Sequence, residues 1–331
     1  MHQQPDKELW QGRVDTEDGD AGKRWHQHIQ MLDINDEAFP SAGAAIIGFC
    51  SDEGVKRNKG RVGAKEGPDH IRKAMAGQAW HKKGLPLYDG GNIVCVNQEL
   101  EASQDGLTDT LIKYLNAELF PVVLGGGHEV AYASGRAVYQ HQQSISAQSV
   151  TGIINFDAHF DLRLPTPKAS SGTPFYQLSQ FCQANNQSFN YLCLGISETA
   201  NTEALFNRAD ENRVNWVMDS DMHWANLSSN LKVIDEFMAT CDQLYLTIDL
   251  DVLPAATMPA VSAPASRGVS LDYLERLLDR IIENHHCGIA RIKLVDLAEC
   301  NPRFDSDNRG ARVAARLVNK LLAIPFKGDA K

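Results

Sequence analysis

The chain has no C-x-x-C pair, because its seven cysteines stand singly along 331 residues. An odd, scattered set of cysteines is typical of reduced thiols and argues against a disulfide scaffold or a zinc–thiolate site. The chain also has no apolar run long enough to cross a bilayer, and its first residues include no apolar segment of the kind that directs secretion. We therefore expect a soluble protein in the cytoplasm.

The sequence has no surplus of basic residues. Lys and Arg number 32 against 42 Asp and Glu, which gives a net charge of −10 at pH 7. Such a balance disfavours nucleic acid and anionic membrane surfaces as partners. With 43% hydrophobic and 22% charged residues, the composition is typical of a globular protein and not of a disordered or collagen-like one.

What the sequence does contain is a regular alternation of apolar segments and amphipathic stretches. Near-continuous apolarity is typical of parallel strands that are buried on both faces. Such segments occur at 44–50, 91–96, 121–126, 151–157, 191–196, 213–218, 243–250 and 290–297. Helical patterns occur at 68–76, 108–119, 128–140, 271–286 and 309–324. We predict a three-layer α/β sandwich with a mainly parallel sheet of about eight strands, formed by one domain over residues 41–331, after an N-terminal extension over residues 1–40.

Three of the expected strands end in clusters of metal-ligand residue types. The clusters are Gly-Gly-Gly-His-Glu at 125–129, Asp-Ala-His-Phe-Asp at 157–161 and Asp-Leu-Asp at 249–251. Ligands bind open parallel sheets at the carboxyl ends of the strands, so these side chains should gather in one crevice. In the second cluster, positions i, i+2 and i+4 would point to one side of an extended segment. The expected ligands are His128, Asp157, His159, Asp161, Asp249 and Asp251.

Four carboxylates and two imidazoles, without a cysteine, favour manganese over softer metals. Without cations the four acids would repel one another in a buried crevice. Each cluster alone has an ordinary alternative: a capped turn before a helix for the first, and a general divalent-metal or phosphate site for the third. The three clusters together are far more specific than any one of them.

These motifs resemble those of the ureohydrolase family, which includes arginases, agmatinases and formimidoylglutamases. Two further segments share the resemblance, one around Gly54–Ala64 and one at Val295–Pro302. The likeness extends over about residues 40–325 and implies an arginase-like or deacetylase-like fold. It also implies that the domain is catalytic, that it acts on a small molecule, and that the chain forms a homo-oligomer.

The resemblance implies a centre of two Mn²⁺ ions per subunit, which supplies an activated water. One ion would be held by His128, Asp157, Asp161 and Asp249, and the other by Asp157, His159, Asp249 and Asp251. Asp161 would carry a proton during catalysis, and Glu299 would contact the cationic amidine or guanidine end of the substrate. The alternative for Glu299 is a helix cap or a surface acid.

Departures from the arginase pattern point to one branch of the family. Arginases and agmatinases have a histidine in a segment that resembles S-G-N-x-H-G, where this chain has Phe175. This departure and others in the loop Val261–Ala265 resemble the formimidoylglutamase branch. Arg163, two residues after Asp161, could grip a carboxylate with its planar guanidinium, although an isolated arginine is more often a solvated surface residue.

The expected reaction is therefore hydrolysis of N-formimidoyl-L-glutamate to L-glutamate and formamide, a step of histidine degradation. The alternative is another amidinohydrolase, with an activity like that of guanidinobutyrase, agmatinase or arginase. A deacetylase-like amide hydrolase would use a single zinc ion. A catalytically silent metal-binding subunit is a further alternative, which the intact set of six ligands disfavours.

Overall fold

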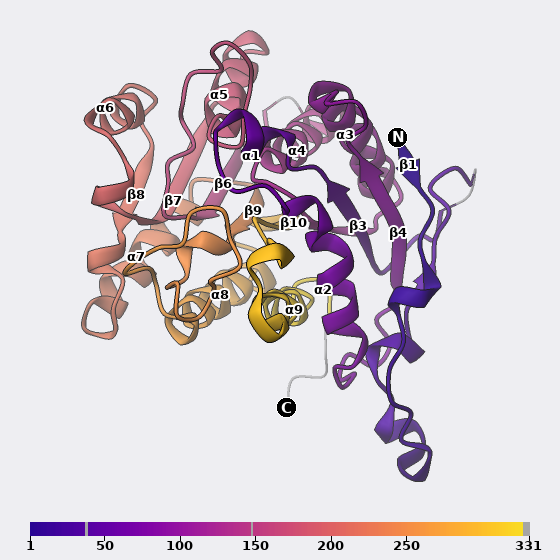
Figure 1. Ribbon diagram of the computed structural model, residues 1–331. Coiled ribbons are helices and arrows are strands. Elements are labelled where there is room, and N and C mark those ends of the chain that lie inside the picture. Colours follow the sequence, from indigo (N-terminus) through magenta and orange to yellow (C-terminus); the bar gives the residue numbers. More distant parts are fainter. Residues whose placement is uncertain (37–38, 147, 327–331) are drawn as a thin grey trace.

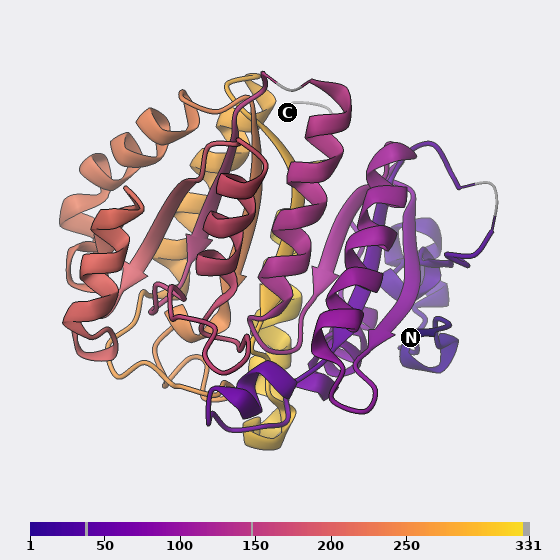
Figure 2. The same ribbon diagram turned by 90° about the horizontal axis from the view of Figure 1, so that it is seen from above.

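A twisted sheet lies at the centre of the protein, and helices cover both of its faces (Figures 1 and 2). This computed structural model describes residues 1–36, 39–146 and 148–326. Residues 327–331 of the expected domain therefore lie outside the described residues. The strands are β1 His2–Gln3, β2 Gln30–Met31, β3 Ala44–Cys50, β4 Leu87–Val94, β5 Phe120–Leu124, β6 Thr151–Phe156, β7 Asn190–Ile196, β8 Asn215–Met218, β9 Gln243–Asp249 and β10 Arg291–Ala298.

The eight apolar segments of the sequence all form strands, and the sheet is mainly parallel, as expected. The order across the sheet is β1-β4-β3-β5-β10-β9-β6-β7-β8, with β2 also paired to β4. Among these ten strands, only β1 pairs in the antiparallel sense. The strands β1 and β2 bring the total to ten and were not expected. Each has only two residues, which is too short to leave a hydrophobic pattern in the sequence.

Two separate hydrophobic cores lie on the two faces of the sheet and make the three layers. Neighbouring strand residues point to opposite faces, so Ile46 belongs to one core and Ile47 to the other. One core is completed by α2 Gly67–Ala76, α7 Leu227–Met238, α8 Leu271–His286 and α9 Arg309–Leu321. The other is completed by α3 Leu100–Asn116, α4 Val130–Ile145, α5 Pro174–Ala184 and α6 Glu203–Glu211. No helix in the described part of the chain is long and apolar enough to cross a membrane.

Several helix boundaries differ from the expected ones for physical reasons. Helix α3 begins at Leu100, eight residues earlier than the pattern indicated. The hydrophobic pattern missed its first turns because some of their buried positions hold polar residues, which form hydrogen bonds within the protein. The Gln104 amide donates to the carbonyl of Glu129, and the Thr108 hydroxyl donates to the carbonyl of Gln104. Helix α4 begins at Val130, so His128 stays on the turn that precedes it. Four helices were not expected: α5, α6, α7 and the five-residue helix α1 Glu53–Arg57.

A buried ion pair between α2 and β4 also anchors the N-terminal segment, through the side chain of Trp10. Arg72 of α2 donates two hydrogen bonds, each of 2.9 Å, to the carboxylate of Asp89 on β4. The indole of Trp10 donates to the same carboxylate at 2.7 Å. In Figure 1 the segment runs along the edge of the sheet beside β4. The division into an extension and a catalytic domain stays a prediction.

Replacement of Arg72 by leucine is expected to lower the free energy of unfolding by about 3–5 kcal/mol, because it leaves the buried Asp89 carboxylate without its counter-charge. Urea denaturation followed by circular dichroism measures this loss. The control is Lys73→Leu, which removes an exposed cation from the same helix and should change the stability by less than about 0.5 kcal/mol. Equal stability of the two variants would contradict the assignment.

Candidate metal centre

The carboxyl ends of four neighbouring parallel strands lie side by side at one edge of the sheet. In the order β5-β10-β9-β6, each is followed at its carboxyl end by one of the expected site residues. His128 follows β5, Glu299 follows β10, Asp249 ends β9, and Asp157 follows β6. Because parallel strands carry their carboxyl ends to one edge, segments more than 100 residues apart in sequence meet there. The expected convergence is therefore present in the fold.

Two identical turns aim the carboxylates of the centre. The Oδ1 atom of Asp157 accepts a hydrogen bond from the backbone N–H of His159 at 2.7 Å. In the same way, Oδ1 of Asp249 accepts from the N–H of Asp251 at 2.8 Å. In each turn the second oxygen, Oδ2, faces Nδ1 of His128 in the middle of the site. The segment after Phe156 is thus bent, and the extended geometry expected from the i, i+2, i+4 spacing is not what brings its side chains together.

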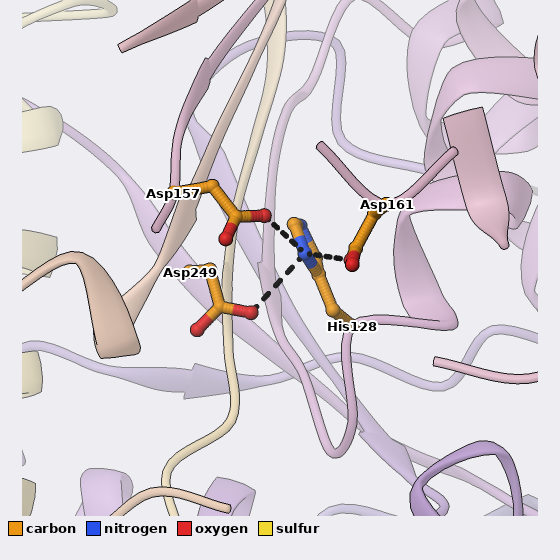
Figure 3. A group of neighbouring side chains, drawn as sticks. All are labelled: His128, Asp157, Asp161 and Asp249. Atoms are coloured by element: carbon orange, nitrogen blue, oxygen red, sulfur yellow. Dashed lines mark hydrogen bonds and ion pairs between the residues drawn. The ribbon is translucent and has the colours of Figure 1, made fainter. Parts of the chain in front are cut away.

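The imidazole of His128 lies at the centre of the first group of ligands (Figure 3). Its Nδ1 atom is 3.1 Å from Oδ2 of Asp157, 3.0 Å from Oδ2 of Asp161 and 3.2 Å from Oδ2 of Asp249. A single ring N–H cannot donate good hydrogen bonds to three carboxylates at once. One nitrogen and three anionic oxygens, buried and mutually within 4.8 Å, fit a divalent cation placed among them.

A second group lies beside the first and shares Asp157 with it. The Nδ1 atom of His159 is 3.0 Å from Oδ2 of Asp251 and 3.5 Å from Oδ1 of Asp157. These three residues also bring one ligand atom each to within 4.8 Å of one another. Asp249, expected in both sets of ligands, belongs by this measure to the first group. Its bridging role stays a prediction.

The charges of the site disturb one another strongly. Burial lowers the pKa of His128, but the hydrogen bonds of Asp157, Asp161 and Asp249 outweigh it, so that the pKa lies well above its usual value. Burial and the charges of Asp251 and Asp157 raise the pKa of Asp249 well above its usual range. Burial also raises the pKa values of Asp161 and Asp251, whereas the hydrogen bonds of His128 and His159 lower that of Asp157. Three acids that resist ionisation in one buried cluster need cations to balance them. The donor set therefore fits the expected metal ions.

Neighbouring side chains form hydrogen bonds with the ligand side chains and fix their orientation. Nε2 of His128 lies 3.0 Å from the hydroxyl of Thr247 on β9, which fixes the plane of the ring. The amide of Asn155 donates to Oδ2 of Asp157 at 3.0 Å. Gly126 allows the close approach of the loop before His128, because a Cβ atom there would lie 1.8 Å from the carbonyl oxygen of Ser51. None of these supports was expected from the sequence.

Glu299 is held in a strained and buried position above the same centre. Its φ of 69° lies in the left-handed region, which residues other than glycine rarely adopt outside special sites. Its Oε1 atom accepts from the backbone N–H of His128 at 2.9 Å, and its buried Oε2 atom has no partner among the described residues. Burial, with the charges of Asp249 and Glu129, raises the pKa of Glu299 well above its usual range. This free carboxylate oxygen is suited to a cationic group.

Glu129, which was not singled out from the sequence, is a second buried carboxyl near Glu299. Its Oε1 atom accepts from the hydroxyl of Ser51 and from the N–H of Gly54, each at 2.9 Å. Burial raises the pKa of Glu129 to about 7. Glu129 thereby ties the turn before α4 to the first turn of α1, and it does not line the pocket over the ligands.

A pocket of about 320 Å³ opens over the ligand cluster. Glu299 lies within its lining and the exposed Arg163 lies among the residues that surround it, so both expected substrate contacts reach the same space. Residues that sequence reasoning missed also line it, namely Asn58, Lys59, Gly60, Arg61, Ser171, Leu205, Ser262 and Ala263. Lys59 has a φ of 62°, a left-handed conformation that the sequence did not indicate.

Phe175, which stands where the arginase pattern has a histidine, is a buried packing residue. Its ring meets that of His128 edge to face with centroids 5.5 Å apart, and it stacks on Tyr191 with centroids 4.4 Å apart. Phe175 is not part of the pocket lining. The phenyl ring has no group that could carry a proton, and it packs against the imidazole of His128.

Comparison with known proteins agrees with this geometry. Residues 42–323 match the arginase family. The chain is 49% identical to the formimidoylglutamase of Aeromonas hydrophila over 317 residues, which cover 96% of this chain and 98% of that protein. It is 48% identical to the formimidoylglutamase of Vibrio parahaemolyticus, over 96% of this chain and 93% of that protein.

Solved structures share the fold at lower identity. The formimidoylglutamase of Bacillus subtilis superposes with a TM-score of 0.78 at 23% identity, covering 92% of each chain. The Trypanosoma cruzi formiminoglutamase with Mn²⁺ superposes with a TM-score of 0.74 at 24% identity, covering 88% of this chain and 96% of that one. The expected three-layer fold and the expected hydrolase class are confirmed. The chain belongs to the arginase family.

Proposed function

We propose that the protein hydrolyses N-formimidoyl-L-glutamate to L-glutamate and formamide, as a step of histidine degradation, and that it forms a homo-oligomer. The observation that carries the proposal is the arrangement of charges in the pocket. Glu299, whose buried Oε2 atom has no partner among the described residues, lines the pocket, and the exposed Arg163 belongs to the same lining. The substrate has the complementary pattern, with one amidinium and two carboxylates. Relatives about 48% identical over nearly the whole chain bear the name of this activity.

The six ligands would hold two Mn²⁺ ions, one in the group around His128 and one in the group around His159. When bound, such ions act as Lewis acids that make a water nucleophilic near neutral pH. The chain's own contribution is then to bind and orient the amidine and to deliver a proton.

Glu299 would hold the amidinium through its free Oε2 atom and so present the planar carbon to the ligand cluster. The oxygen of water joins that carbon, and the bond from the carbon to the glutamate nitrogen breaks. Asp161, whose Oδ2 atom faces the cluster, would take a proton from the attacking water and return it to the leaving amine. Formamide and glutamate result, with no proton passing through Phe175.

A substrate panel tests the proposal. The purified protein, loaded with Mn²⁺, is assayed on formimidoylglutamate, agmatine, arginine and 4-guanidinobutyrate, with formamide and urea measured as products. Agmatine lacks both carboxylates, so its kcat/KM should be lower by about a hundredfold or more, from two lost charge-assisted contacts. Release of urea from a guanidine substrate at the higher kcat/KM would assign the protein to another amidinohydrolase activity.

Replacement of Arg163 by alanine is expected to raise KM for formimidoylglutamate by about ten- to a hundredfold, with kcat changed little, because a bidentate contact to a remote carboxylate is lost. Steady-state kinetics at constant Mn²⁺ measure the split between the two constants. Arg163→Lys keeps the charge without the planar fork and should give a smaller increase. An unchanged KM in the alanine variant would remove Arg163 from the substrate site.

A further inference from the structure

A second hollow adjoins the pocket over the ligands. Its volume is about 580 Å³, and it shares three lining residues with that pocket: Asn58, Arg163 and Leu205. Its walls come from the end of α1, the loop between β6 and α5, and the first turns of α6 (labelled in Figure 1). We call this hollow the vestibule. Because the two spaces share a wall, a molecule in the vestibule is next to the catalytic pocket.

The vestibule is lined by cations. Arg57, Arg163, Lys168 and Arg208 all contribute to its wall, and none of its described lining residues is acidic. Arg57 pairs with Glu53 and Glu101, two carboxylates outside the lining, and the charge of Lys168 also acts on Glu101. Within the described ranges, Arg163, Lys168 and Arg208 form no ion pair. A positive hollow in a chain with a net charge of −10 is therefore a local exception.

The loop that carries Arg163 and Lys168 is held on both sides by the other two cations. Nη1 of Arg57 donates to the carbonyl of Ala169 at 3.1 Å, and Nη1 of Arg208 donates to the carbonyl of Leu162 at 2.6 Å. Between these points, the N–H of Arg163 donates to the carbonyl of Gly172 at 2.9 Å. Arg57 and Arg208 thus fix the loop, while the ammonium of Lys168 and the guanidinium of Arg163 remain available for a ligand. The hollow is preorganised for anions.

We propose that the vestibule is an anion-capture site that concentrates the dicarboxylate substrate at the mouth of the catalytic pocket. The inference rests on the proposed function, since it takes its ligand class from that substrate. An acidic protein repels a net anionic molecule at long range, so capture needs a local region of positive potential. The hydroxyls of Thr166, Ser170 and Thr202 in the same wall offer further hydrogen bonds to carboxylates. Arg163 lines both spaces, so it can bind a carboxylate of the substrate in the vestibule and in the catalytic pocket.

The test uses the charge reversal Lys168→Glu, at a residue outside the catalytic pocket. At about 10 mM salt, where the Debye length is about 30 Å, kcat/KM for formimidoylglutamate should fall about fivefold while kcat stays the same. At about 1 M salt the Debye length is about 3 Å, and the difference from the wild type should nearly vanish. The control is Lys83→Glu, which makes the same change in net charge at an exposed site before β4, at the opposite edge of the sheet. It should leave kcat/KM within a factor of two.

Binding of glutarate, a dicarboxylate without an amidine, separates this inference from the proposed function. Calorimetry at low salt should show that glutarate binds the wild type and Lys83→Glu alike, and binds Lys168→Glu several-fold more weakly. This result would hold even if the wild type failed to turn over formimidoylglutamate, a failure that would overturn the proposed function alone. Equal glutarate affinity in the three proteins would overturn the proposal that the vestibule captures anions. So would a lower kcat/KM of Lys168→Glu that persists at about 1 M salt.

Discussion

Asp249→Ala is expected to abolish both metal binding and hydrolysis, with kcat/KM lower by about a thousandfold or more. Asp249 ends β9, its Oδ1 atom holds the N–H of Asp251, and its Oδ2 atom faces the imidazole of His128. The substitution therefore removes one ligand and also releases the turn that aims another. The Mn²⁺ content of the purified variant, measured by elemental analysis, and its kcat/KM for formimidoylglutamate should fall together.

The control for this experiment lies at the other end of the same strand. Asp242 precedes β9 on the surface, and its carboxylate accepts from the N–H of Val150 at 2.8 Å. Asp242→Ala should keep the metal content and the kcat/KM of the wild type. An Asp249→Ala variant that retains its manganese and most of its turnover would refute the proposed metal centre. Loss of turnover with full metal content would leave Asp249 a role in catalysis and remove it from the ligands.

The sheet could be predicted because its central strands are buried on both faces. Burial on two sides leaves a run such as Ala44–Cys50 with almost no polar residue, which is a strong signal over a short length. The strands β1 and β2 have no such signal, since each has only two residues and neither is fully buried. Buried polar residues, such as Gln104 of α3, interrupt the apolar periodicity by which a helix is recognised in the sequence.

The convergence of the metal ligands could also be predicted, but the way in which each one is aimed could not. Clusters after parallel strands must meet at one edge, whatever their side chains do. The aim depends on turns at Asp157 and Asp249 and on left-handed conformations at Asp161 and Glu299. Such conformations are strained for a residue with a Cβ atom and are imposed by the surrounding fold. Local sequence preferences therefore do not indicate them.

The rim of the pocket was the least predictable part, because it is assembled from loops. Arg163 could be singled out from its place two residues after Asp161. Lys59 and Arg61 come from the turn after α1, and Ser262 comes from a loop some 200 residues later in the chain. They meet through contacts such as the hydrogen bond from the N–H of Arg61 to the hydroxyl of Ser262, at 2.9 Å. Nothing in either segment alone indicates this partner.

Glu299→Gln is expected to lower kcat/KM for formimidoylglutamate by about thirty- to several thousandfold, with the manganese content unchanged. The glutamine oxygen can still accept from the N–H of His128, so the backbone there should keep its place. What disappears is the negative charge on the buried oxygen that has no partner in the protein. Loss of one member of a buried charge pair costs about 2–5 kcal/mol, and here the other member would be the substrate's amidinium.

The matched control is Glu129→Gln, because Glu129 is also a buried glutamate close to His128 but does not line the pocket. Its Oε1 atom serves Ser51 and Gly54, and a glutamine oxygen can accept both hydrogen bonds. Kinetics and metal analysis of the two variants side by side separate a role toward the substrate from general damage to a crowded acidic site. Equal losses in both variants, or a Glu299→Gln enzyme close to the wild type, would mean that the amidinium is bound elsewhere. A large loss confined to Glu299→Gln, with full metal content, is the result that the free carboxylate oxygen above the ligands leads us to expect.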